Sequence, residues 1–162
     1  MVNDLVSHLP LYKYVDDSAL SEVVRVGELS TLQTEVDRVN QWSIANNMNL
    51  NVKKTKEFIV SYLKNQPSPQ PLMIDNQYLE NLTTKLLGVY LTSDLKWTKH
   101  VTHICSKASK RLYALRLLKR NGVQSRDLQK VYCSFVRPIL EYACPVWHSS
   151  LSILLSDQIE YI

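Results

Sequence analysis

The sequence has little glycine and little cysteine. Only 3 of its 162 residues are glycine, no Gly-rich phosphate loop is present, and neither GxSxG nor HExxH occurs. The three cysteines form no CxxC pair and are odd in number, which argues against a disulfide framework. These absences argue against a secreted disulfide scaffold and against the enzyme classes that depend on those motifs.

Long apolar runs are also missing. No segment approaches the roughly 20 apolar residues that cross a bilayer, and the start of the chain lacks the pattern of a signal peptide. We therefore expect an intracellular protein of the cytoplasm or nucleus, with no membrane partner. A hydrophobic content of 45% over 162 residues is sufficient for one domain with a real core.

Charge is unevenly distributed along the chain. Residues 1–95 hold 8 Lys+Arg and 11 Asp+Glu, a balance of −3, whereas residues 96–162 hold 11 and 4, a balance of +7. Between Lys96 and Arg126 there are 9 basic residues and no acid. This asymmetry predicts a polyanion partner for the second half, and the alternative is a solvated helix face.

Residues 1–95 are predicted to combine strands with one helix. Leu11–Leu20 favours a β-hairpin with Asp16 and Asp17 at its tip, and Val23 and Val24 are assigned to its returning strand. We also expect a helix over 31–46 opened by a capping box at 30–33, a basic turn over 51–56 and a strand over 58–63. A proline-rich loop over 65–71, a hairpin turn at 75–76 and a strand over 85–91 follow, and Gly88 in that last strand marks a bend or a close backbone approach.

Residues 97–162 are predicted to be helical. Apolar residues recur every three or four positions from Trp97, and Asn121-Gly122 predicts the end of this first helix. A second helix is expected from Ser125, interrupted at Pro138, with Pro145 ending its continuation, and a third over 151–162. The fold class is therefore α+β, with antiparallel strands plus a helix over 1–95 and an all-helical region over 96–162.

Several short motifs together resemble one family. Tyr14-Val15-Asp16-Asp17 resembles the YxDD motif of reverse transcriptases. Segments similar to other motifs of that family occur in the same order, namely Val2-Asn3-Asp4-Leu5 (NDL), Asn51-Val52-Lys53-Lys54-Thr55 (NxxKT), Leu86-Leu87-Gly88-Val89 (LLG), Arg137-Pro138-Ile139-Leu140-Glu141-Tyr142-Ala143, and Pro145-Val146-Trp147. The resemblance is to polymerases of non-LTR, LINE-type retrotransposons of the jockey and CR1 kind.

That resemblance implies a partial polymerase palm over 1–95 and a truncated helical thumb over 96–162. It implies RNA-directed DNA synthesis by two-metal nucleotidyl transfer, with Mg²⁺ or Mn²⁺ as cofactor and a primer–template duplex and dNTP as partners. By the same resemblance Asp16 and Asp17 are metal ligands and Lys54 lies near the leaving pyrophosphate. The primer terminus would be supported by Leu86, Leu87, Gly88 and Val89, and the duplex backbone would be contacted by Lys107, Lys110, Arg111 and Arg116.

The sequence also departs from that family. The family supplies a further catalytic carboxylate from a strand well upstream of YxDD, whereas 13 residues precede Tyr14 here and Asp4 lies in the NDL segment. The metal is therefore expected only together with that missing Asp, and the chain alone is expected to be inactive. The alternatives are a non-catalytic, nucleic-acid-binding transposon relic that uses the basic thumb helix, and an incompletely folded chain without function.

A zinc site is a further reading of one cluster. His100, His103 and Cys105 form an HxxHxC pattern, but this spacing matches no closed four-ligand set. We instead expect both histidines on the polar face of the helix and Cys105 near the core.

Overall fold

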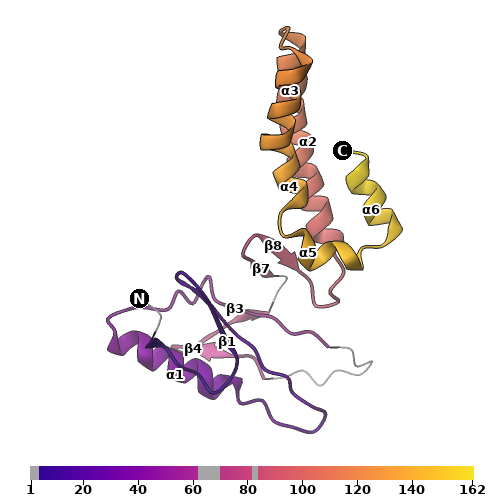
Figure 1. The fold of residues 1–162 in the computed structure, drawn as a ribbon. Helices are drawn as coiled ribbons and strands as arrows, with labels where there is room; N and C mark the ends of the chain where they lie inside the picture. Colours follow the sequence, from indigo (N-terminus) through magenta and orange to yellow (C-terminus); the bar gives the residue numbers. More distant parts are fainter. Residues whose placement is uncertain (1–3, 62–69, 82–83) are drawn as a thin grey trace. The chain divides into compact units, whose positions relative to one another are not determined.

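The structure is a computed structural model that describes residues 4–61, 70–81 and 84–162. The chain divides into two compact units (Figure 1). The first unit contains the described residues up to Ile59 and residues 70–81, and the second contains Val60, Ser61 and residues 84–162. The division lies near residue 82 and not at residue 95, because the last two strands pack with the helices.

The first unit combines short paired strands with one helix. Its elements are β1 (Leu11–Tyr14), β2 (Asp17–Leu20), α1 (Leu32–Ala45), β3 (Lys56–Glu57), β4 (Met73–Ile74), β5 (Gln77–Tyr78) and β6 (Glu80–Asn81). β1 pairs antiparallel with β2 and β4 with β5, whereas β3 and β6 form a parallel pair. The predicted mixture of strands and one helix is confirmed. The strands were all predicted to be antiparallel, and the β3–β6 pair differs from that prediction.

The hairpin of β1 and β2 forms where it was predicted. Tyr14 faces Asp17 across the ladder, so the turn consists of Val15, at a φ of 56°, and Asp16. The ladder ends with the bond from the Ser21 N–H to the Pro10 carbonyl, and Pro10 itself has no N–H to offer. Val23 and Val24 therefore lie beyond the returning strand and are exposed, contrary to the prediction.

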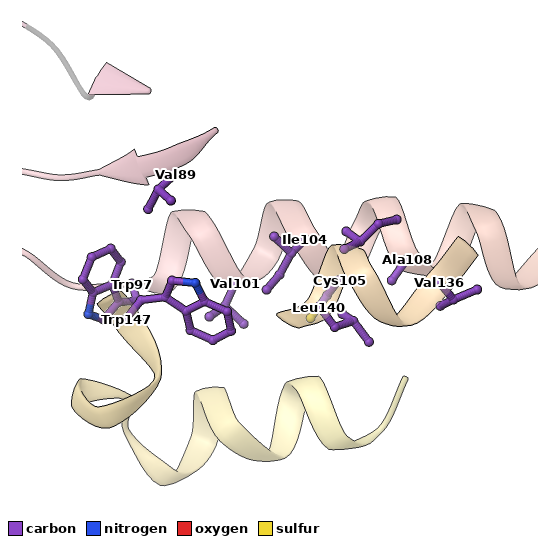
Figure 2. Close-up of a cluster of buried hydrophobic side chains, with 10 residues drawn as sticks. Val89, Trp97, Val101, Ile104, Cys105, Ala108, Val136, Leu140 and Trp147 are labelled. Atoms are coloured by element: carbon purple, nitrogen blue, oxygen red, sulfur yellow. The ribbon is translucent and has the colours of Figure 1, made fainter. Parts of the chain in front are cut away.

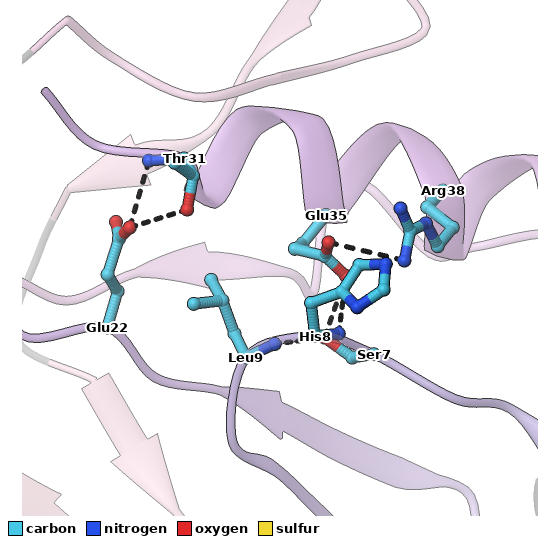
Figure 3. A network of polar contacts seen from close by, with 7 residues as sticks. All are labelled: Ser7, His8, Leu9, Glu22, Thr31, Glu35 and Arg38. Atoms are coloured by element: carbon cyan, nitrogen blue, oxygen red, sulfur yellow. Dashed lines mark hydrogen bonds and ion pairs between the residues drawn. The ribbon is translucent and has the colours of Figure 1, made fainter.

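Helix α1 packs its apolar side on a small core. Val36 is buried together with Leu72, Ile74 and Leu79 from the β4–β5 region. The capping box predicted for Ser30 and Gln33 is wrong, because the residue before α1 is Thr31 and its side chain makes no capping bond. Glu22 instead accepts hydrogen bonds from the N–H (2.9 Å) and hydroxyl (2.7 Å) of Thr31 (Figure 3). The Gln33 amide instead donates to the carbonyl of Met73 and accepts from its N–H, both at 2.9 Å. This pairing ties α1 to β4.

The remaining predictions for the first unit are partly correct. Asp75 and Asn76 form the predicted turn between β4 and β5, with φ of 49° and 59°. The strand predicted over 58–63 is wrong for residues 58–61, which carry no strand, because pairing with β6 is limited to Lys56–Glu57. Residues 62–63 of that strand and most of the predicted loop over 65–71 lie outside the described residues.

The second unit contains one hairpin followed by helices. Its elements are β7 (Thr84–Leu86), β8 (Val89–Leu91), α2 (Thr98–Arg120), α3 (Ser125–Val131), the π-helix η2 (Tyr132–Val136), α4 (Arg137–Glu141), α5 (Cys144–Trp147), the 3₁₀ helix η3 (His148–Ser150) and α6 (Ile153–Glu160). The strand predicted over 85–91 is divided into β7 and β8, because Leu87 and Gly88, at φ of 44° and 90°, turn the chain between them. The change of direction predicted at Gly88 is therefore confirmed, but it is a hairpin turn and not a bend within one strand.

One apolar core holds this unit together (Figure 2). Its buried members come from β8, from one face of α2 and the residue before it, and from η2, α4 and α5: Val89, Trp97, Val101, Ile104, Cys105, Ala108, Val136, Ile139, Leu140 and Trp147. Leu155 and Ile159 of α6 pack against the same core, which confirms the predicted third helix. Burying each large apolar side chain contributes about 1.5–3 kcal/mol, so this face of α2 organises the unit.

The two prolines of the last helices act differently from each other. The predicted interruption near Pro138 is present as η2, because Pro138 has no N–H to continue the α-helical ladder. Pro145 does not end a helix as predicted. The chain breaks earlier, at Ala143 with a φ of 53°, and Pro145 lies in the first turn of α5, where its missing N–H costs nothing.

Candidate nucleic-acid interface

Asp16 and Asp17 lie at the tip of the β1–β2 hairpin. Both carboxylates are exposed, as are the rings of Tyr12 and Tyr14 behind them. Mg²⁺ takes about six oxygen ligands, and in sites that transfer phosphate groups these are one or two carboxylates together with substrate phosphates and water. The described residues bring no group of three or more His, Cys, Asp or Glu side chains together.

Lys54 lies in a turn that is closed by Asn51. The Asn51 carbonyl accepts from the N–H groups of Lys54 and Thr55 at 2.9 Å and from the Thr55 hydroxyl at 3.0 Å, while its side-chain oxygen accepts from the Lys54 N–H at 3.2 Å. The side chains of Asn51 and Thr55 are therefore explained by local turn geometry. The Lys54 side chain is exposed to solvent.

The four residues of the predicted primer-grip motif form the β7–β8 turn region. Leu86 and Leu87 are exposed, whereas Val89 enters the core. The Tyr142 hydroxyl donates to the Leu87 carbonyl at 2.8 Å. The φ of 90° at Gly88 favours glycine, and a Cβ there would lie 3.1 Å from Cε1 of the same tyrosine, which is a tight contact.

The four basic residues predicted from α2 do not share one face. Lys107 and Lys110 are exposed on the same side, and Arg116 is exposed about 120° around the helix from Lys110 at 100° per residue. Arg111 is half-buried, with its guanidinium carbon 4.3 Å from the centre of the Phe135 ring and one nitrogen donating to the Phe135 carbonyl. Its cation is therefore engaged in joining α2 to η2.

A basic cluster surrounds Tyr90 and His103, and sequence reasoning missed two of its lysines, Lys85 and Lys99. Their rings are 4.8 Å apart with planes inclined by 59°, and the ammonium groups of Lys85 and Lys99 lie 5.4 Å and 5.7 Å from the centre of the Tyr90 ring. Burial, and then the charges of Lys85, Lys107 and Lys110, lower the pKa of His103. We call Lys85, Lys99, Lys107 and Lys110 the lysine cluster.

The lysine cluster has a partial signal in the sequence. Lys99, His103, Lys107 and Lys110 follow at steps of four, four and three, which places them on one side of α2, away from Val101 and Ala108 in the core. Lys85 and Tyr90 join them only through the register of β7 with β8, where the two residues face each other. The packing of β8 on α2 then brings the Tyr90 ring against His103.

The HxxHxC pattern does not converge on a metal. His100 is only 1% exposed, not on the polar face as predicted, and its Nδ1 accepts the Tyr90 N–H at 3.4 Å. Cys105 is buried, as predicted, which raises its thiol pKa, and the thiol donates to the Gln158 carbonyl at 3.7 Å. His103 instead contacts Tyr90, so the three side chains have separate partners.

Comparison of the chain with protein-family models, with curated proteins and with solved structures gives no match in any of the three. Among the described helices, none is both long enough and apolar enough to cross a membrane.

Proposed function

We propose that the chain carries the C-terminal palm and thumb regions of an RNA-directed DNA polymerase of the LINE type, and that its second unit holds the primer–template duplex. The lysine cluster carries this proposal. Four lysines from two elements surround one aromatic pair on the outer side of α2. Lysines arranged along one helix face contact phosphates without reading bases, as a protein that copies any sequence requires.

The β1–β2 hairpin supports the polymerase part of the proposal. Its two-residue turn places the acids of the YxDD-like motif at an exposed tip, between strands that are fixed by the register from Leu11 to Leu20. By the family resemblance, two-metal chemistry on this hairpin needs a further carboxylate, and the described residues bring no group of three or more His, Cys, Asp or Glu side chains together. We therefore expect duplex binding, but no nucleotidyl transfer, from these 162 residues alone.

Removal of charge from the cluster tests duplex binding. The affinity for an RNA–DNA hybrid of about 16 base pairs is measured by fluorescence anisotropy for the wild type and for Lys107→Gln/Lys110→Gln. We expect the double variant to bind at least about tenfold more weakly, because two phosphate contacts are lost.

A matched control removes the same charge elsewhere. Lys96 and Lys130 are exposed lysines in ion pairs with Asp94 (3.8 Å) and Asp127 (2.9 Å), so Lys96→Gln/Lys130→Gln also lowers the net charge by two. The proposal expects this control to bind much as the wild type does. Equal losses in both double variants would mean that net charge, not the lysine cluster, controls binding.

The second candidate is a transposon relic that binds nucleic acid without catalysis. It is favoured by one observation: among the described residues, no third metal ligand lies beside Asp16 and Asp17. Primer extension by the longest reading frame that contains this sequence separates the two. A polymerase extends the primer, and Asp16→Ala abolishes extension while duplex affinity is unchanged. A relic extends nothing, and Asp16→Ala changes neither property.

A further inference from the structure

We propose that the lysine cluster and His103 form a proton-linked site for the phosphodiester backbone of a nucleic-acid duplex, in which His103 takes up a proton when the duplex binds. This inference rests on the proposed function. It adds that duplex binding is coupled to the protonation of His103, which the resemblance to polymerases does not imply. The observation behind it is the position of His103 among like charges, in contact with one aromatic ring.

Tyr90 holds the histidine at this position. Its ring lies 4.8 Å from that of His103 and within 6 Å of the ammonium groups of Lys85 and Lys99, so one aromatic face on β8 organises groups from β7 and α2. The Tyr90 N–H in turn donates to His100, which is buried in the core of the unit. The ring that contacts the His103 imidazole is therefore itself bonded to the core of the unit.

The charges around His103 oppose its protonation while the site is empty. Lys85 acts from β7 and Lys107 and Lys110 act from its own helix, in addition to the effect of partial burial. His103 also contributes to the lowered pKa of His100, one turn earlier on α2. Phosphates that bind the lysines would cancel these positive charges and add negative ones, so the protonated imidazole becomes favourable only in the complex.

The extent of the cluster favours a linear polyanion over a single anion. Lys99 and Lys110 are separated by eleven residues, which is roughly 16 Å along the helix axis. A nucleic-acid strand carries one phosphate for about every 3.4 Å of duplex axis, so a strand lying along this face presents several phosphates to the cluster. One isolated phosphate would reach only part of it.

The direction of the pH dependence follows from linkage. Free His103 has a pKa below the ordinary 6.5, and in the complex that pKa is higher. Between the two values binding takes up one proton, so affinity rises as pH falls, by at most about tenfold per pH unit. Above the higher value His103 is neutral in both states, and the dependence vanishes.

Hybrid-duplex affinity at about pH 7.5 and about pH 6, at constant salt, tests the inference. We expect wild-type affinity to rise about threefold to tenfold on acidification, His103→Gln to lose this rise, and His148→Gln, which changes an exposed histidine on η3, to keep it. Wild-type binding that is independent of pH, or an undiminished rise in His103→Gln, would overturn the inference and leave the proposed function standing. No binding of the hybrid at either pH would overturn both.

Two further measurements complete the test. The first uses only the wild type, so it does not depend on whether a variant folds, and the second distinguishes a nucleic acid from a membrane surface as the partner. The pKa of His103, followed by NMR in the wild type, should rise when the hybrid duplex is added, and an unchanged or lowered value would contradict proton uptake. Vesicles that contain phosphatidylserine should compete poorly with the hybrid, and binding that prefers vesicles would assign the site to a membrane surface instead.

Discussion

The hydroxyl of Tyr142 donates a 2.8 Å hydrogen bond to the carbonyl of Leu87, and joins the residue after α4 to the turn between β7 and β8. Tyr142 lies in the Arg137–Ala143 segment and Leu87 in the Leu86–Val89 segment, two of the polymerase-like motifs. These motifs are 55 residues apart in the sequence and in contact in the structure.

Replacement of Tyr142 by phenylalanine tests this bond. Tyr142→Phe removes the donor and leaves the ring, so we expect the free energy of unfolding to fall by about 0.5–1 kcal/mol. Chemical denaturation measures the change. Tyr113→Phe, at an exposed tyrosine of α2, is the control and should shift the midpoint little. Equal effects of the two changes would show that the bond to Leu87 contributes nothing.

Substitution of Gly88 tests the packing of the β7–β8 turn against Tyr142, and Gly122, which follows α2, serves as its control. Both have left-handed φ, 90° and 82°, but a Cβ at Gly88 would lie 3.1 Å from the Tyr142 ring, whereas nothing lies within 4 Å at Gly122. Alanine at either position therefore carries a backbone cost of about 1 kcal/mol, and Gly88→Ala carries a crowding cost as well. The excess should disappear in a Tyr142→Ala background, as measured by a double-mutant cycle. If Gly88→Ala still cost more unfolding free energy than Gly122→Ala in that background, the crowding would not come from the Tyr142 ring.

Stability of the second unit should fall in mild acid. His100 is buried, and its Nε2 has no hydrogen-bond partner within the part of the chain that the structure describes. Burial, and then the charge of His103, lower its pKa below 6.5, so the unfolded chain binds the proton more readily than the folded one. The stabilisation is present above about pH 6.5 and is lost as pH falls from there through the folded pKa.

Urea denaturation between about pH 7.5 and pH 5 measures this effect. His100→Gln should flatten the decline, while His148→Gln, at an exposed histidine, should leave it unchanged. Stability that increases on acidification, or a decline that His100→Gln leaves untouched, would contradict the assignment.

Glu35 connects the segment before β1 to helix α1. Its carboxylate is 4% exposed, accepts from the Ser7 hydroxyl (2.8 Å) and the His8 N–H (3.2 Å), and lies 3.4 Å from the Arg38 guanidinium (Figure 3). The Ser7 bond, followed by the His8 N–H and the charge of Arg38, lowers the pKa of Glu35 despite its burial. Its contribution to stability is therefore present above about pH 4.5 and is lost as pH falls through the lowered pKa.

Glu35→Gln should lower the urea midpoint at pH 7 and reduce the loss of stability below about pH 4.5. Glu28→Gln removes an exposed carboxylate whose ion pair with Arg25 spans 3.9 Å, and should have little effect. A Glu35 variant that is as stable as the wild type at pH 7 would show that the connection to Ser7 and His8 is dispensable.

Elements whose signals lie in neighbouring residues were predictable from the sequence. The β1–β2 hairpin, the turn at Asp75-Asn76 and helices α1 and α2 form where local pattern and turn chemistry place them. Leu87 shows the limit of this reasoning, because β-rich neighbours indicate a strand whereas it adopts a left-handed turn. Its contact with Tyr142, which no local pattern reports, stabilises that turn.

The candidate site was only half predictable for the same reason. Lys107 and Lys110 were expected from the resemblance to a polymerase thumb, and both are exposed on α2. The engagement of Arg111 with Phe135 depends on how η2 packs against α2. Lys85 reaches the cluster through strand register and His103 through its contact with Tyr90. Each of these contacts joins separate elements, and single-residue propensities carry no information about them.

Salt dependence of duplex affinity tests the central claim most directly. For the wild type, the logarithm of the association constant should fall steeply and linearly with the logarithm of the salt concentration, because phosphate contacts release counterions. Lys107→Gln/Lys110→Gln should reduce that slope by about 1.5 to 2, and Lys96→Gln/Lys130→Gln should leave it nearly unchanged. A flat wild-type slope, or the same slope in the wild type and the Lys107/Lys110 variant, would show that the lysine cluster does not bind a nucleic-acid backbone.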